Sequence, residues 1–206
     1  MLEVYLFVNP LGGKCMSSEQ NIIKLANELP DQLSYQFVPM LSMQLNDSPI
    51  ASNTVSLTDR NQTFAQHYQT VLDYKAALFQ GKKRGRQFLL ELQGALLKAG
   101  QQYSDSLVQG VAKTVNLDLE MFLEDRQSNL AKRAFKADQR LAAEMKVEHA
   151  STAVIYNALS DESGLRVDDV SYPVLREVCE RQGFTPTSSI QTPTSSFDNH
   201  PHLRVL

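Results

Sequence analysis

The chain has 206 residues, which is enough for one domain with a substantial core, or for one domain that carries an insertion. Its 42% hydrophobic and 21% charged residues are typical of a globular protein in water, and a net charge of −3 argues against general binding to nucleic acid or an anionic membrane. The start does not read as a signal peptide, no apolar run approaches the ~18 residues of a membrane span, and two cysteines give no disulfide framework, so we expect a cytoplasmic protein.

The first predicted elements form a β–α–β unit. Residues 2–8, "LEVYLFV", predict a short buried strand. A helix is expected to begin at about Cys15 or Ser17, because Ser17 and Gln20 stand at the spacing of a capping box. Residues 33–40 alternate between the two faces of a second strand. Such a unit predicts two parallel strands joined by a crossover helix.

A long helical block follows a polar loop at residues 41–58. From about Asp59 to Met145 the apolar residues recur at helical spacing throughout. Three residues stand where N-caps are expected within this block: Ser104, Asp118 and Ser128.

Strand character returns at residues 151–157. A turn at "DESG" then predicts an antiparallel partner in "LRVDDV", residues 165–170. A final helix is expected with Pro173 near its start and Gly183 just past its end.

The order of elements predicts an α/β fold whose core is divided by a helical insertion. The expected boundaries are a first core part at 1–58, an inserted helical domain at 59–134 and a second core part at 135–184. Residues 185–206 repeat the motif TPTSS, lack periodic apolar residues and are predicted to be disordered.

This arrangement resembles the thioredoxin-like fold of the DsbA family, in which a helical domain is inserted into a thioredoxin core. "FVNPLGGKC" at residues 7–15 is similar to the opening F-[VI]-[DN]-P-L-C-x-x-C of the YjbH or SpxH type of that family, except that Gly12 stands at the first cysteine. "RLAAEMKVEHASTAVIYN" at 140–157 resembles that family's approach to its third core strand, and the similarity covers about residues 1–183. The resemblance implies an adaptor that binds the transcription regulator Spx and promotes its degradation by the protease ClpXP.

The residues at the family's active-site positions argue against dithiol chemistry. Disulfide exchange needs an attacking thiolate and a second thiol, and Gly12 supplies neither, whereas Gly12 and Gly13 suit a tight turn into a helix. Lys14 and the helix N-terminus favour a thiolate at Cys15, but the family's second cysteine is usually the more buried one, so we expect Cys15 to be a packing residue. The family's cis-proline would fall at Ser151, where a cis bond costs roughly 2.5–4 kcal/mol, and we expect a trans bond and an altered groove.

An enzyme hypothesis from another class stays open. In it Cys15 acts alone, in glutathione-dependent chemistry such as that of kappa-class transferases or in a mono-cysteine isomerase. This alternative predicts an exposed Cys15 beside a ligand cavity. Cys179 lies in "PVLREVCERQ" among apolar residues and is expected to be a core thiol, although the sequence also permits a Cys15–Cys179 disulfide.

"GKKRGR" at residues 81–86 is a dense basic run with two interpretations. Its cations, Lys82, Lys83, Arg84 and Arg86, could form a solvated joint between two helices or a docking surface for an acidic partner. His67 and His149 have no partner at the spacing of metal ligands, so we expect neither a metal nor a cofactor.

Overall fold

The structure is a computed structural model that describes residues 1–41, 57–159 and 164–185. Nearly all of the polar loop expected at 41–58 and of the tail expected at 185–206 lies outside these residues. In chain order the elements are β1 (Leu2–Val8), α1 (Gly13–Glu28), β2 (Leu33–Pro39), α2 (Leu57–Phe79), α3 (Lys82–Gln93), a π-helical turn η2 (Gly94–Lys98), α4 (Asp105–Thr114), α5 (Leu119–Gln127), α6 (Asn129–Glu144), β3 (Thr152–Asn157), β4 (Leu165–Val167) and α7 (Tyr172–Arg181).

The four strands form one sheet in the order β2-β1-β3-β4. β1 and β2 are parallel, with Val4 opposite Tyr35, whereas β3 is antiparallel to both β1 and β4. The predicted parallel pair and the predicted antiparallel hairpin are both confirmed, although β4 is shorter than the expected strand. This mixed sheet with its helices confirms the thioredoxin-like α/β fold.

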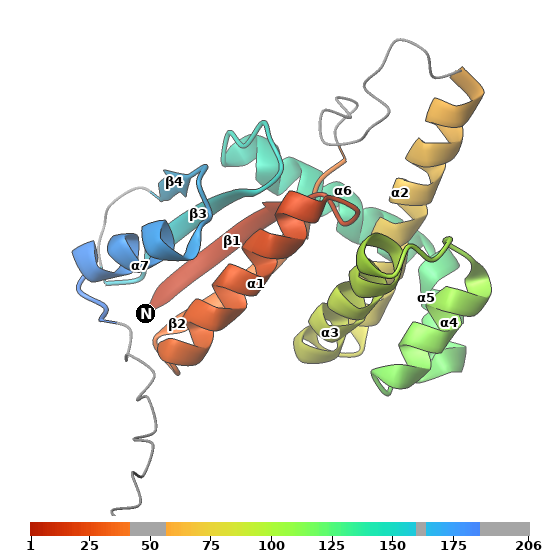
Figure 1. Cartoon of the computed structure of the whole chain (residues 1–206), viewed down its shortest axis with the longest axis horizontal. Coiled ribbons are helices and arrows are strands. Elements are labelled where there is room, and N and C mark those ends of the chain that lie inside the picture. Colours follow the sequence, from red (N-terminus) through yellow and green to blue (C-terminus); the bar gives the residue numbers. More distant parts are fainter. Residues whose placement is uncertain (42–56, 160–163, 186–206) are drawn as a thin grey trace, which may run out of the picture.

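Helices cover the two faces of the sheet to different extents. α1 and α7 lie side by side along one face (Figure 1), where they bury a cluster that includes Leu6, Leu25, Leu175 and Phe37. On the other face the end of α6 packs against the sheet in a smaller cluster, in which Ala142 joins buried strand residues such as Val38 and Val154.

The start of α1 corrects one prediction. The helix begins at Gly13, with Gly12 as its N-cap and no side-chain capping bond, so the expected capping box does not form. Ser17 lies inside the helix instead, and its hydroxyl donates to the Gly13 carbonyl. A hydroxyl one turn into a helix commonly bonds the carbonyl four residues earlier, and the sequence spacing alone does not distinguish the two arrangements.

The helices α2 to α5 have a core of their own beside the sheet (Figure 1). In it Phe88 and Phe122 pack with their ring centroids 5.2 Å apart. The expected N-caps are confirmed: the side chains of Ser104, Asp118 and Ser128 accept hydrogen bonds from the backbone N–H groups of Leu107, Met121 and Ala131.

α6 connects the helical part to the sheet. Its Asp138 pairs with Lys75 of α2, while its Gln139 donates to the Pro39 carbonyl of β2. The boundary expected at 134–135 falls inside this helix and stays a prediction. α7 has Pro173 in its first turn, and Gly183 follows its end at φ +83°, as the sequence predicts. Within the described residues, no helix combines the length and apolar character that crossing a membrane requires.

Candidate functional site

The loop between β1 and α1 holds the positions at which the DsbA family places its two cysteines. Gly12 is buried in extended conformation, and its N–H donates to the Asn9 carbonyl at 2.9 Å. A Cβ atom at Gly12 would lie 3.2 Å from the Cys15 sulfur and 3.3 Å from the Asn9 carbonyl oxygen. The loop is therefore closed tightly around Gly12, where a side chain would require its neighbours to shift by a few tenths of an ångström, while Gly13 and Lys14 are exposed.

Cys15 has no accessible surface in the first turn of α1. Its sulfur accepts a hydrogen bond of 3.2 Å from the Asn9 N–H. A thiol in this position packs as a small apolar side chain, and an external disulfide or electrophile reaches it only after the loop opens. The monothiol alternative requires an exposed Cys15, so this geometry does not favour it.

The second cysteine lies in the core as well. Cys179 is buried on α7, and burial, with a smaller effect of Glu180, raises the pKa of its thiol to about 11. It is therefore protonated at neutral pH. No disulfide joins Cys15 to Cys179.

Ser151 occupies the position just before β3 where thioredoxin-like enzymes have their cis-proline. It is buried at φ +65°, and its N–H donates to the Phe7 carbonyl at 2.7 Å. None of the peptide bonds in the described ranges is cis. Its hydroxyl shares a buried hydrogen bond of 2.7 Å with the hydroxyl of Ser18, one turn beyond Cys15. The structure therefore brings the family's two active-site segments together and joins them by a hydrogen bond between two serines.

A buried carboxyl group, that of Glu19, follows Ser18 in the chain, and the sequence analysis did not predict it. Glu19 of α1 has no accessible surface, and its Oε1 accepts a hydrogen bond of 3.0 Å from the Nε2 of Gln93 on α3. Burial raises the pKa of Glu19 to about 8, while the bond from Gln93 lowers it by less. The sequence does contain a signal, because Glu19 precedes Ile22 and Ile23 at helical spacing on the apolar face of α1.

The two remaining oxygens of this pair show what its protonation achieves. Neither the Glu19 Oε2 nor the Gln93 Oε1 has a hydrogen-bond partner within the described part of the chain. Two acceptors cannot bond to one another, but a protonated Glu19 can donate from Oε2 to the Gln93 oxygen. The hydrogen bond from Gln93 to Glu19 already ties the thioredoxin core to the inserted helices, and protonation of Glu19 would add a donor facing this amide.

A buried ion network inside the helical part was also not foreseen. The Arg126 Nε donates to the Asp73 Oδ1 at 2.7 Å, and its Nη1 donates to Asp105 at 2.8 Å. The Tyr103 hydroxyl donates to the second Asp73 oxygen at 2.5 Å. Burial raises the pKa of Asp73 and outweighs the opposing effect of Arg126. This network joins α2, α5, the first residue of α4 and the segment before it, which is a structural role.

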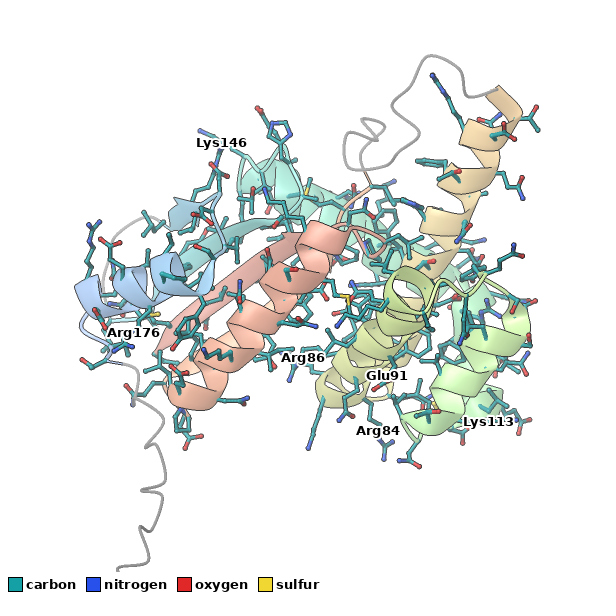
Figure 2. The ribbon with its side chains drawn as sticks, in the orientation of Figure 1. Arg84, Arg86, Glu91, Lys113, Lys146 and Arg176 are labelled. Carbon is teal, nitrogen blue, oxygen red and sulfur yellow. The ribbon has the colours of Figure 1, made fainter. Side chains whose placement is uncertain are left out.

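The basic run lies away from the closed loop. Lys82, Lys83 and Arg84 are exposed in the first turn of α3, which follows α2 after a two-residue joint. Figure 2 shows Arg86 between α3 and α1, with Arg84 beside the start of α3. Gln93, which contacts α1, ends the same helix, so the basic run and the Gly12 loop lie at opposite ends of α3.

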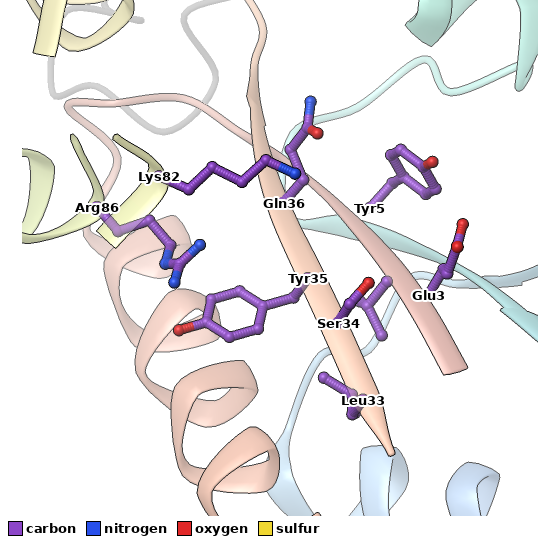
Figure 3. A pocket seen from close by; sticks show the side chains of 9 residues that line it. Glu3, Tyr5, Leu33, Ser34, Tyr35, Gln36, Lys82 and Arg86 are labelled. Carbon is purple, nitrogen blue, oxygen red and sulfur yellow. The ribbon is translucent and has the colours of Figure 1, made fainter. Parts of the chain in front are cut away.

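Two members of the run line a cavity of about 330 Å³ at the β2 edge of the sheet. The Arg86 guanidinium carbon lies 4.4 Å from the centroid of the Tyr35 ring, in the geometry of a cation–π contact. Lys82 extends over the strand toward Gln36 (Figure 3). Lys83 and Arg84 are absent from this lining, so the structure divides the four expected docking residues into two pairs.

Within the described ranges, no three His, Cys, Asp or Glu side chains gather as metal ligands would.

Comparison with known proteins agrees with this geometry. A family model described as thioredoxin matches residues 5–177. The protein named ClpXP adapter protein SpxH of Bacillus subtilis is 32% identical over 95% of this chain and 73% of its own length. The protein of that name from Bacillus licheniformis is 30% identical over 95% of this chain and 72% of its own length. Among solved structures, the cytosolic disulfide reductase DsbM of Pseudomonas aeruginosa has a TM-score of 0.64 at 14% identity, over 87% of this chain and 98% of its own, and this likeness concerns the fold alone.

Proposed function

We propose that this chain, which belongs to the thioredoxin family and to its SpxH group, is an adaptor for the ClpXP protease and not a thiol oxidoreductase. The similarity to curated ClpXP adapter proteins over 95% of the chain is the single observation that carries the proposal. The closed loop supports it, because Gly12 has no nucleophile and Cys15 has no accessible surface. A binding protein needs a rigid shape and a few anchoring side chains, and the thioredoxin-like fold supplies both without a dithiol.

We further propose that the substrate delivered to ClpXP is an Spx-like transcription regulator and that the adaptor acts in the cytoplasm. One observation supports the cytoplasm: the two buried thiols are not joined in a disulfide. Among the four cations of the basic run, Lys82 and Arg86 line the cavity at the β2 edge and are proposed docking residues for the regulator. Lys83 and Arg84 are exposed outside it and are proposed docking residues for the protease.

Reconstituted degradation tests the proposal. Purified Spx and ClpXP are incubated with and without this chain, and the amount of Spx is followed over time. We expect the chain to accelerate loss of Spx and to form a complex with it that gel filtration detects. If Spx turnover is unchanged and no complex forms, the assignment is wrong. In parallel, insulin reduction by the chain is expected to stay at the uncatalysed rate.

A further inference from the structure

The outer edge of β2 is half covered and half open. β2 ends the sheet, and in the described residues its partner is β1 alone. In this parallel pair the even-numbered residues of β2 turn their backbone groups toward β1, as the bonds from Leu2 to Gln32 and from Met40 to Val8 indicate. The odd-numbered residues Leu33, Tyr35 and Phe37 therefore present their backbone groups to the outside.

Other elements satisfy this edge at its two ends. The Leu33 N–H donates to the Leu29 carbonyl at 3.2 Å. The Phe37 carbonyl accepts from the Tyr74 hydroxyl at 3.3 Å, and the Pro39 carbonyl accepts from Gln139 at 3.0 Å. In the described part of the chain, the Leu33 carbonyl and both backbone groups of Tyr35 have no such partner. An exposed row of this kind is a template for an added strand.

Two adjoining cavities lie along this open half of the edge. The cavity of about 330 Å³ and a second one of about 170 Å³ share Tyr35, Gln36, Lys82 and Arg86 in their linings. The second cavity is also lined by Phe37, Tyr74 and Leu78. Together they make a groove between β2 and the start of α3, defined here as the β2 groove, which has an apolar end for an anchoring side chain.

The charges beside the β2 groove determine which segment it suits. No ion pair within the described ranges includes Lys82 or Arg86. Glu3, the acid in the lining, belongs to β1 and lies across β2 from Arg86 (Figure 3). Lys82 stands in the first turn of α3, where its positive charge opposes the helix dipole and is unfavourable for the isolated helix. The edge of β2 next to α3 is therefore complementary to an extended segment that carries a carboxylate.

We infer that the β2 groove binds an extended acidic segment of the adaptor's protein partner, which adds to the sheet as a strand alongside Tyr35. The main chain of the segment bonds to Leu33 and Tyr35, an acidic side chain pairs with Lys82 and Arg86, and an apolar side chain enters the cavity beside Phe37. This inference rests on the proposed function for the identity of the partner.

The full chain and two charge-reversed double variants test the inference. In one double variant, Lys82→Glu and Arg86→Glu, both charges lining the groove are reversed. The matched control, Lys83→Glu with Arg84→Glu, makes the same change of net charge in the same helix but outside the groove. Each protein is titrated with purified Spx and, separately, with a synthetic extended peptide of about ten residues in which valine and glutamate alternate. Affinity is measured by calorimetry or NMR titration, and exchange of the Tyr35 amide is measured with and without the ligand.

For the unaltered chain we expect Spx to bind and both ligands to slow exchange of the Tyr35 amide by at least about tenfold. The groove variant should lose at least about tenfold in affinity, as removal of a close interfacial charge pair does, while the control variant stays within about twofold. If the peptide protects Tyr35 and Spx does not bind, the inference stands and the proposed partner is wrong. If Spx binds but Tyr35 stays unprotected, or if both double variants bind as the unaltered chain does, the inference is wrong and the adaptor function stands. If the groove variant merely self-associates, the cations only guard the strand edge and the inference is again wrong.

Discussion

Burial of Glu19 predicts how the free energy of unfolding depends on pH, in both sign and size. Its carboxyl group is fully buried between α1 and α3, with one oxygen bonded to Gln93 and the other without a partner in the described part of the chain. Burial raises its pKa from 4.5 to about 8. Between these two values the folded chain holds a proton that the unfolded chain has lost. The free energy of unfolding therefore decreases as pH rises, by about 1.4 kcal/mol for each pH unit.

The substitution Glu19→Gln isolates this effect. A glutamine at this position can keep the hydrogen bond that Oε1 accepts from Gln93, it carries a donor where a protonated carboxyl group would have one, and it does not titrate. The stability contributed by Glu19 is fully present below pH 4.5 and is lost as pH approaches 8. We expect the variant to gain about 4 kcal/mol relative to the unaltered chain between pH 5 and pH 8, as an order of magnitude.

Urea unfolding at pH 5, 6, 7 and 8 measures the difference between the two proteins, in which all other titrating groups cancel. The matched control is Glu91→Gln, which changes an exposed glutamate on the same helix as Gln93. This control measures what removal of a surface carboxylate from α3 does by itself. A flat difference for Glu19→Gln would show that Glu19 is ionised or solvated in the folded chain, and the reasoning would fail.

Three further predictions concern other buried positions. Arg126→Met should lower the free energy of unfolding by about 3–5 kcal/mol, because Asp73 would stay buried without its cation, and a loss under 1 kcal/mol in urea unfolding would contradict this. Gly85→Ala should lower the free energy of unfolding by about 1–3 kcal/mol, because its Cβ would lie 2.6 Å from the Leu78 Cδ2 and 2.9 Å from the Leu78 Cα. Thermal unfolding measures this loss, and an unchanged midpoint would show that α2 and α3 can separate. Iodoacetamide should modify Cys15 at least a hundredfold more slowly in the folded chain than in urea, and equal rates, measured by mass spectrometry, would restore the monothiol hypothesis.

Local signals in the sequence predicted much of the fold. The three helix caps follow from spacing within a few residues, since a cap such as Ser104 needs a partner only three positions away. The parallel strand pair and the hairpin of β3 and β4 follow from the order of neighbouring elements. The predicted start of α1 was wrong because the Ser17 side chain can either cap a helix N-terminus or bond to the carbonyl four residues earlier. In the structure it donates to the Gly13 carbonyl. The family was predicted from the resemblance of residues 7–15 to the family's opening motif, because the spacing of apolar and capping residues does not identify a family.

The candidate site was harder to predict because its contacts join distant parts of the chain. Glu19 and Gln93 are separated by 74 positions, and Arg126 and Asp73 by 53. The polar face of a helix looks the same in sequence whether it meets solvent or a buried partner. The basic run was visible as a charge pattern, but its division between groove and solvent follows from the position of Tyr35, which only the fold determines.

The position of α3 explains how one fold can combine a closed loop around Gly12 with the proposed β2 groove. At its end α3 is joined to α1 by Gln93 and Glu19, and near its start Arg86 lies over the Tyr35 ring of β2. Both attachments are to the thioredoxin core, so the inserted helices are not a lid that hinges freely over the old catalytic loop. The cation beside the β2 groove is therefore held in place before a partner arrives, and a preorganised charge costs little ordering entropy on binding. Gly12 leaves no side-chain nucleophile near one end of α3, while the proposed docking groove near the other end does not depend on a dithiol.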